Sequence, residues 1–302
     1  MSDKNESMLQ KLYQALLSEK TQERGELIII SIAIFSFILH LLIIYLVDFG
    51  IIPIENPSEL VREPIAAIYT PFSFILVYEV YMLVYYLPKS IAHYIGKQYE
   101  IITLIVIRRI FKDLSNLEFT SQWFQTKYDL QFTYDLISTL VLFLLIFWYH
   151  RLNRSRIQDS GSEEGLPDTL KTFIRRKQVV AALLVPVLIA LGISSFYTWA
   201  ETHVFSLTQM VGSIRDVNDI FFNEFFAVLI LTDVLLLLFS LFHTGKFHKV
   251  MRNSGFIIST ILIRLSFGAE GVLNNALIVV GVLFGILVLY IHNLYDKLDK
   301  EN

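Results

Sequence analysis

The segment that decides the fold reads LIIISIAIFSFILHLLIIYLV over residues 27–47. A helix needs about 20 mostly apolar residues to cross a hydrocarbon core roughly 30 Å thick. This run meets that requirement, with His40 as its most polar member. It is also too long for the apolar part of a secretory signal. The sequence therefore predicts a membrane-spanning helix at this position.

Seven further apolar runs follow along the chain, so we expect an all-α, polytopic membrane helix bundle with about eight transmembrane helices. The third and seventh runs are short, which is typical of tilted or incomplete crossings. The expected spans cover residues 27–47, 68–87, 99–111, 130–149, 179–200, 225–242, 255–267 and 272–293.

The composition agrees with this class of protein. The chain has 302 residues, of which 54% are hydrophobic and 18% charged, whereas soluble domains carry about 25% charged residues. The absence of cysteine excludes disulfides, iron–sulfur clusters and thiolate metal sites. A formal net charge of −3 is too small to indicate a nucleic-acid partner.

The basic residues predict the orientation. Most of the 25 Lys and Arg residues fall before the first span, after even-numbered spans or after the last span. Because basic residues concentrate in cytoplasmic segments, both termini are expected on the cytoplasmic side of a cytoplasmic (inner) membrane. Residues 1–26, polar and mixed in charge, are expected to form a cytoplasmic lead-in helix.

The two halves of the chain match each other at a shift of about 155 residues. We therefore expect two parallel four-helix repeats at 27–150 and 178–302, joined by a cytoplasmic linker at 151–177. Each repeat reads as span, span, basic turn, short arginine-bearing span, span. The pairs at the shift of 155 are His93 and His248, Lys97 and Arg252, and Arg109 and Arg264, while Glu79 matches Asp233 and His150 matches His292 at other shifts.

Charged residues inside spans are the candidate site, because burying a charge in a bilayer is expensive. Helical rise places Glu79 and Arg109 at similar depth on consecutive helices of the first repeat, and Arg108 adjoins Arg109. In the second repeat the same holds for Asp233 and Arg264. Each acid and arginine is expected to form a pair, either to neutralise charge and set helix register or to line an ion or proton path. One or two arginines per helix do not indicate a voltage sensor.

Other polar residues carry secondary expectations. Asp135 and Asn275 are expected either to cap helix N-termini or to complete the charged cluster, with capping preferred. His40 is expected to be a hydrogen-bonded interior residue. The basic turns are expected to anchor anionic lipid headgroups, with phosphate or anion binding as the alternative; their residues are Lys89, Lys97, Lys246, Lys249 and Arg252. No metal site is expected, and His243 and His248 are assigned to a basic turn.

The sequence has no Gly-rich phosphate loop, nucleophile elbow or zinc-protease motif. No catalytic residue and no cofactor is therefore expected, and the chain is interpreted as a non-enzyme. Membrane enzymes that use His and Asp near the interface keep the enzyme class open. The expected partners are the lipid bilayer and its headgroups, with a homo-oligomer left open.

The second repeat resembles the phosphate-starvation-inducible E (PsiE-like) family of membrane proteins. The residues that carry the resemblance are Asp233, Phe242, Gly245, Phe247, His248, Arg252, Thr260, Arg264, Asn275 and Leu277. The first repeat matches more loosely through Glu79, Lys97 and Arg109, and departs from the pattern at Lys97 and in its doubled arginine. Typical members are a single four-helix unit, so the resemblance implies a tandem duplication. It also implies an inner-membrane protein expressed under phosphate limitation and brings no catalytic residues.

Two functions are expected from these observations. The first is a non-enzymatic stress-response or regulatory membrane protein in which the acid–arginine pairs are structural. The second is a channel or transporter for protons or a small ion, with the same residues along its path. The observation that would most help to distinguish the two is whether a water-filled cavity reaches Glu79 and Asp233.

Overall fold

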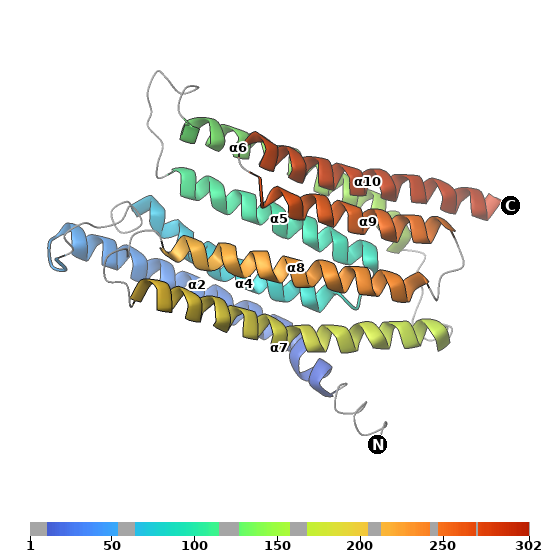
Figure 1. Cartoon of the computed structure of the whole chain (residues 1–302), viewed down its shortest axis with the longest axis horizontal. Coiled ribbons are helices and arrows are strands. Elements are labelled where there is room, and N and C mark those ends of the chain that lie inside the picture. Colours follow the sequence, from blue (N-terminus) through green and yellow to red (C-terminus); the bar gives the residue numbers. More distant parts are fainter. Residues whose placement is uncertain are drawn as a thin grey trace.

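The computed structural model of the chain describes residues 11–53, 64–114, 127–157, 168–204, 213–241, 247–269 and 271–301. Within these ranges the protein has eight α-helices and no strand, which confirms the expected all-α fold (Figure 1). The elements are α2 (Glu19–Asp48), the 3-10 helix η1 (Pro64–Ile68), α4 (Tyr69–Tyr86), α5 (Ile91–Leu114), α6 (Lys127–Ile157), α7 (Asp168–Val204), α8 (Ser213–Leu241), α9 (Phe247–Ser266) and α10 (Val272–Glu301).

Most of the helices extend beyond the apolar runs that predicted them. Helices α5 and α9, which hold the two short runs, have 24 and 20 residues, or about 36 and 30 Å of rise. The polar residues before each short run are helical too, because hydropathy marks the apolar part of a helix and not its ends. Helix α2 begins at the N-cap Ser18, whose hydroxyl accepts a hydrogen bond from the backbone N–H of Thr21. The expected lead-in segment therefore runs into the first apolar run without a break at residue 26.

The helices pack in chain order in two groups. Helix α2 packs on α4, α4 on α5 and α5 on α6; α7 packs on α8, α8 on α9 and α9 on α10. The groups meet mainly where α6 packs against α10, and also where α4 meets α7 and α5 meets α9. Figure 1 shows these helices running side by side along the long axis of the molecule.

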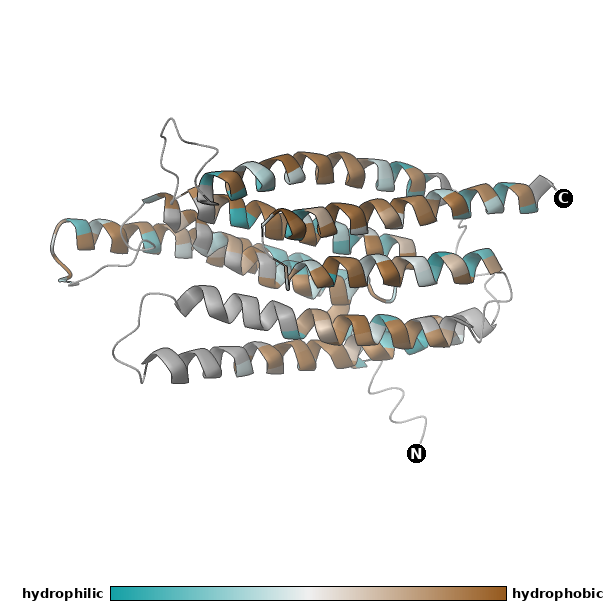
Figure 2. Cartoon of the chain, turned by 45° about the horizontal axis from the view of Figure 1, so that its top comes forward, coloured by the Kyte–Doolittle hydropathy of each residue, from teal (hydrophilic) through white to brown (hydrophobic). Residues whose placement is uncertain are grey.

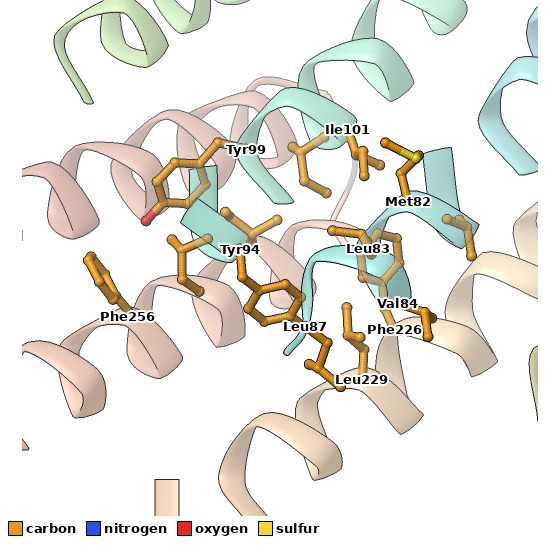
Figure 3. Close-up of a cluster of buried hydrophobic side chains, with 14 of the residues drawn as sticks. Met82, Leu83, Val84, Leu87, Tyr94, Tyr99, Ile101, Phe226, Leu229 and Phe256 are labelled. Atoms are coloured by element: carbon orange, nitrogen blue, oxygen red, sulfur yellow. The ribbon is translucent and has the colours of Figure 1, made fainter. Parts of the chain in front are cut away.

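A core of large side chains lies between the two groups (Figure 3). Leu83 of α4, Tyr99 of α5, Leu229 of α8 and Phe256 of α9 are all fully buried. Full burial of each large apolar side chain contributes about 1.5–3 kcal/mol. The core therefore joins helices from both groups, and it surrounds the polar residues described below.

Helices α9 and α10 approach closely because glycines line their contact. A Cβ atom on Gly255 would lie 2.6 Å from a Val288 methyl carbon, and one on Gly281 would lie 2.8 Å from Ile263. At Gly285 a Cβ atom would overlap the Tyr99 hydroxyl oxygen. Gly281 and Gly285 form a small-xxx-small motif, which allows helix backbones to pack closely in membranes.

Three stretches of helix are long and apolar enough to cross a membrane, namely Lys11–Asp48, Asp129–Arg154 and Val272–Asp299. Large apolar side chains are exposed along them, among them Leu27 and Phe35 of α2, which are 68% and 67% exposed, and Leu140 of α6 at 63%. Figure 2 shows hydrophobic residues along most of these helices. Contiguous exposed apolar surface of this extent is typical of a protein that faces lipid. The fold is thus all-α with three helices that could cross a membrane, which is consistent with a membrane protein.

Replacing Gly285 by alanine should destabilise the bundle by about 1–3 kcal/mol, because the new methyl group overlaps the Tyr99 hydroxyl. The measurement is the midpoint of thermal unfolding of purified protein in detergent. Gly268→Ala is the matched control, since a Cβ atom there would have no neighbour nearer than 3.7 Å, and it should change stability by less than about 0.5 kcal/mol. Equal midpoints for the two variants would contradict the close packing.

Candidate functional site

The Arg109 centre is a polar cluster between α5, α6 and α10, made of Arg109, Asp135, Asn274 and Asn275. The guanidinium binds the Asp135 carboxylate in bidentate fashion, with Nη2 donating to Oδ1 at 2.7 Å and Nε donating to Oδ2. Arg109 also donates to the side-chain oxygens of Asn274, at 2.7 Å, and Asn275, at 2.5 Å. The cluster joins the two groups of helices.

Every oxygen of the Asp135 carboxylate is engaged. Asn275 Nδ2 and Gln131 Nε2 donate to Oδ1 at 2.6 and 2.7 Å, in addition to Arg109. The Asp135 side chain is fully buried. A buried carboxylate is tolerated when it is paired and hydrogen-bonded in this way. The Arg109 centre is therefore suited to holding three helices in register.

The preferred expectation that Asp135 and Asn275 are helix caps is wrong. Helix α6 begins at Lys127, so Asp135 lies about two turns inside it, and Asn275 lies inside the first turn of α10. The alternative, that both residues complete the charged cluster, is confirmed. Asn274, which the sequence did not single out, also belongs to it, and its Nδ2 donates to the Ser266 carbonyl near the end of α9 at 2.6 Å.

The Asp233 centre is a second polar cluster, made of Asp233, Gln98, Thr260, Tyr94 and Lys177. Gln98 Nε2 donates to Asp233 Oδ2 at 3.1 Å, and the Thr260 hydroxyl donates to Gln98 Oε1 at 2.9 Å. The buried Tyr94 hydroxyl lies beside the Asp233 carboxylate and interacts with it electrostatically. Helices α5, α7, α8 and α9 thus each contribute a polar residue.

A small cavity borders the Asp233 centre. Its lining includes Asp233, Lys177, Tyr94 and Asn253, with apolar side chains on the other sides. The Lys177 amine donates to the Lys89 carbonyl at 2.8 Å. Burial lowers the pKa of Lys177 to about 8, against the attraction of Asp233, which acts to raise it. The cavity therefore meets a carboxylate and an amine that are both largely removed from solvent.

The structure does not form the two acid–arginine pairs expected from depth. Arg109 binds Asp135 rather than Glu79, and Asp233 binds Gln98 rather than Arg264. Depth along a helix sets the height of a side chain but not its direction around the axis, and residues of equal height can point to different neighbours. Arg108 is buried, and the Arg264 guanidinium lies 6.0 Å from the centroid of the Phe267 ring.

Glu79, which lies inside α4, belongs to a separate group of charges that includes Lys97 and Glu100. Lys97 is the basic residue that attracts it. Lys97 Nζ itself lies 2.6 Å from Glu100 Oε2, and His150 Nε2 lies 2.8 Å from Glu100 Oε1. The cavity lining does not include Glu79.

The remaining residues singled out from the sequence are spread over several contacts. His40 Nδ1 lies 2.5 Å from the Thr70 hydroxyl of α4, which confirms a hydrogen-bonded histidine. The Lys89 amine lies over the rings of Tyr85 and Tyr86, Lys249 is exposed, and Lys246 lies outside the described residues. Arg252 Nη1 lies 3.2 Å from His292 Nε2, in a cluster that also contains His248 and Asp296.

Comparison with known proteins adds no identification. No protein-family model, curated protein or solved structure matches the chain. The chain is therefore characterised by its all-α fold, in which three helices could cross a membrane, and by two buried polar centres.

Replacing Arg109 by methionine should destabilise the protein by about 3–5 kcal/mol, because it leaves the buried Asp135 carboxylate without its cation. Thermal unfolding in detergent measures the loss. The double variant Arg109→Met with Asp135→Leu should recover much of it, since apolar residues can replace a buried ion pair. A double variant less stable than the single one would show that the charge pair is not the source of the effect.

Proposed function

We propose that this chain is a multi-pass membrane protein that passes protons or a small cation through its helix bundle at Asp233. The observation that carries the proposal is the cavity, which meets a buried carboxylate that no arginine among the residues described by the structure neutralises. Ionisable residues inside membrane bundles that face a cavity commonly mark ion or proton paths.

The partners of Asp233 suit a carboxylate that exchanges a proton or cation. Gln98 and Tyr94 are neutral partners, and burial lowers the pKa of Lys177 to about 8. The Asp135 carboxylate is different, because a bidentate arginine and two amides occupy both of its oxygens. In this proposal the Asp233 centre carries the transported ion, and the Arg109 centre, with Asp135, holds the helices together.

We further propose that all eight α-helices lie in the membrane as two parallel repeats, with both termini cytoplasmic. The packing order supports this, since α2, α4, α5 and α6 contact one another in the same sequence as α7, α8, α9 and α10. The matched residues support it as well. Lys97 and His150 meet at Glu100, and their counterparts Arg252 and His292 meet directly.

The test is ion flux in proteoliposomes that contain purified protein and a trapped pH-sensitive dye. A potassium gradient across the liposome membrane, made electrogenic by valinomycin, supplies the membrane potential. Wild-type protein should acidify or alkalinise the lumen in response to the potential, and Asp233→Asn should reduce flux to the level of empty liposomes. Sodium and potassium gradients, measured with ion-selective dyes, extend the test to small cations.

Glu79→Gln is the matched control, because it removes an acid of the other half that does not line the cavity. It should leave flux unchanged. Wild-type liposomes that pass neither protons nor cations would contradict transport, and Asp233→Asn with wild-type flux would contradict the assignment of the path.

The second candidate is a non-enzymatic regulatory or stress-response protein of the PsiE-like type. The saturated Arg109 centre favours it, because a cluster with every carboxylate oxygen engaged is suited to structure rather than passage. This candidate expects no flux, and it expects the protein level to rise when its native host is grown at limiting phosphate. An unchanged level under that condition would count against it.

A further inference from the structure

Three side chains of the kinds that bind metal ions, His248, His292 and Asp296, lie close together where α9 begins and α10 ends. His248 is the second residue of α9, and His292 and Asp296 lie one turn apart on α10. Their ligand atoms all lie within 4.8 Å of one another. His248 Nε2 is 3.0 Å from Asp296 Oδ1, and His292 Nε2 is 3.5 Å from Asp296 Oδ2. One carboxylate thus faces two imidazole nitrogens, one with each oxygen.

The contacts of His292 define which ring nitrogen carries its lone pair. Arg252 Nη1, which can only donate, lies 3.2 Å from Nε2, so Nε2 accepts. Nδ1 lies 3.1 Å from the carbonyl oxygen of His248, so Nδ1 carries the proton and donates it. The His292 ring is fully buried. An imidazole that donates one N–H to a backbone carbonyl and turns its other nitrogen inward is the arrangement found for metal-bound histidine.

His248 provides an independent observation. Its side chain is only 7% exposed, and its buried Nε2 atom makes no hydrogen bond of good geometry to any residue that the structure describes, although Asp296 Oδ1 is 3.0 Å away. A buried polar atom without such a bond is costly in an apolar surrounding. His248 Nε2 and His292 Nε2 both lie close to the Asp296 carboxylate, at 3.0 and 3.5 Å, and a cation among the three groups would satisfy all of them.

We propose that His248, His292 and Asp296 bind a divalent transition-metal ion, for which Zn²⁺ is the probe. Two imidazoles and one carboxylate form a donor set that suits Zn²⁺. Zinc–ligand bonds of about 2.0–2.1 Å in a tetrahedron separate the ligand atoms by roughly 3.4 Å. The two nitrogen–oxygen separations of 3.0 and 3.5 Å, which involve different oxygens of Asp296, lie on either side of that value, and all the ligand atoms lie within 4.8 Å of one another, so the side chains must close slightly around an ion. Asp299 Oδ2 lies 3.8 Å from His248 Nδ1, the other ring nitrogen, and is placed to orient the His248 ring.

In this structure Arg252 contacts the same nitrogen of His292 that the proposed metal ion would bind. Its Nη1 faces the lone pair of Nε2, while its Nε and Nη2 donate to the Asn253 side chain at 3.1 and 2.9 Å. The guanidinium can keep the Asn253 contacts when a metal ion takes the lone pair. The positive charge opposes the ion, so Arg252 weakens binding and is not a ligand.

The first half of the chain offers a matched control. His93 and His150 occupy the positions that correspond to His248 and His292. His150 lies on Glu100 at 2.8 Å, but the His93 ring stacks on Tyr86 with centroids 5.0 Å apart. These side chains do not form a cluster of three close ligand atoms among the residues that the structure describes. Replacing both histidines removes as many imidazoles without touching the proposed site.

The experiment is isothermal titration of the purified full-length protein in detergent with Zn²⁺, after treatment with a chelator and its removal. Wild-type protein should bind one Zn²⁺ per chain at this site. Asp296→Asn is the primary variant because the Asp296 side chain is partly exposed. Loss of an outer-shell partner weakens metal affinity by up to about 100-fold, so loss of a direct ligand should weaken Zn²⁺ binding by about 100-fold or more. His248→Gln should do the same. Circular dichroism and size-exclusion chromatography check that each variant is folded.

The double variant His93→Ala with His150→Ala should bind Zn²⁺ like wild type, and Arg252→Gln should bind it more tightly. Co²⁺ in place of Zn²⁺ should give the strong visible absorption of a four-coordinate site, lost in Asp296→Asn. Failure of wild type to bind, or equal loss in the first-half control, would overturn the proposal. Weaker binding in Arg252→Gln would overturn the role given to the guanidinium. None of these outcomes depends on ion flux at Asp233.

Discussion

The rest of the structure depends on one constraint, that every charge taken into the bundle needs a partner inside it. The bidentate contact of Arg109 with Asp135 meets this constraint most completely, and two amides of α10 complete it. Because these residues come from α5, α6 and α10, satisfying one carboxylate also sets the relative height of three helices. The glycine contacts between α9 and α10 then set how closely α9 approaches α10.

The sequence was sufficient to predict the helices, because the apolar runs, including the two short ones, are separated from one another by polar residues. It singled out Arg109 and Asp233 as charged residues of the interior, but it preferred a capping role for Asp135 and Asn275. It could not predict their partners. Hydropathy and helical rise give the height of Asp233 and Arg264, but the direction of a side chain depends on helix rotation, which tertiary packing decides.

The histidine cluster was beyond sequence reasoning for a different reason. His248 and His292 are 44 residues apart, and the apolar run that predicts α10 ends near residue 293. The helix continues to Glu301, so Asp296 lies one turn beyond His292 on the same face. A rule that extends helices through amphipathic ends would have placed His292 and Asp296 together, though not His248.

Helix α10 has two unlike sides, and this has a consequence for its evolution. Asn274, Gly281, Gly285 and His292 face protein, whereas Leu273, Val280 and Leu287 are half or more exposed. The exposed side needs only to be apolar, so many residues satisfy it, while each position on the inner side accepts very few. Substitution rates along α10 should therefore rise and fall with a period of about 3.6 residues, and the slow positions should record which contacts natural selection maintains.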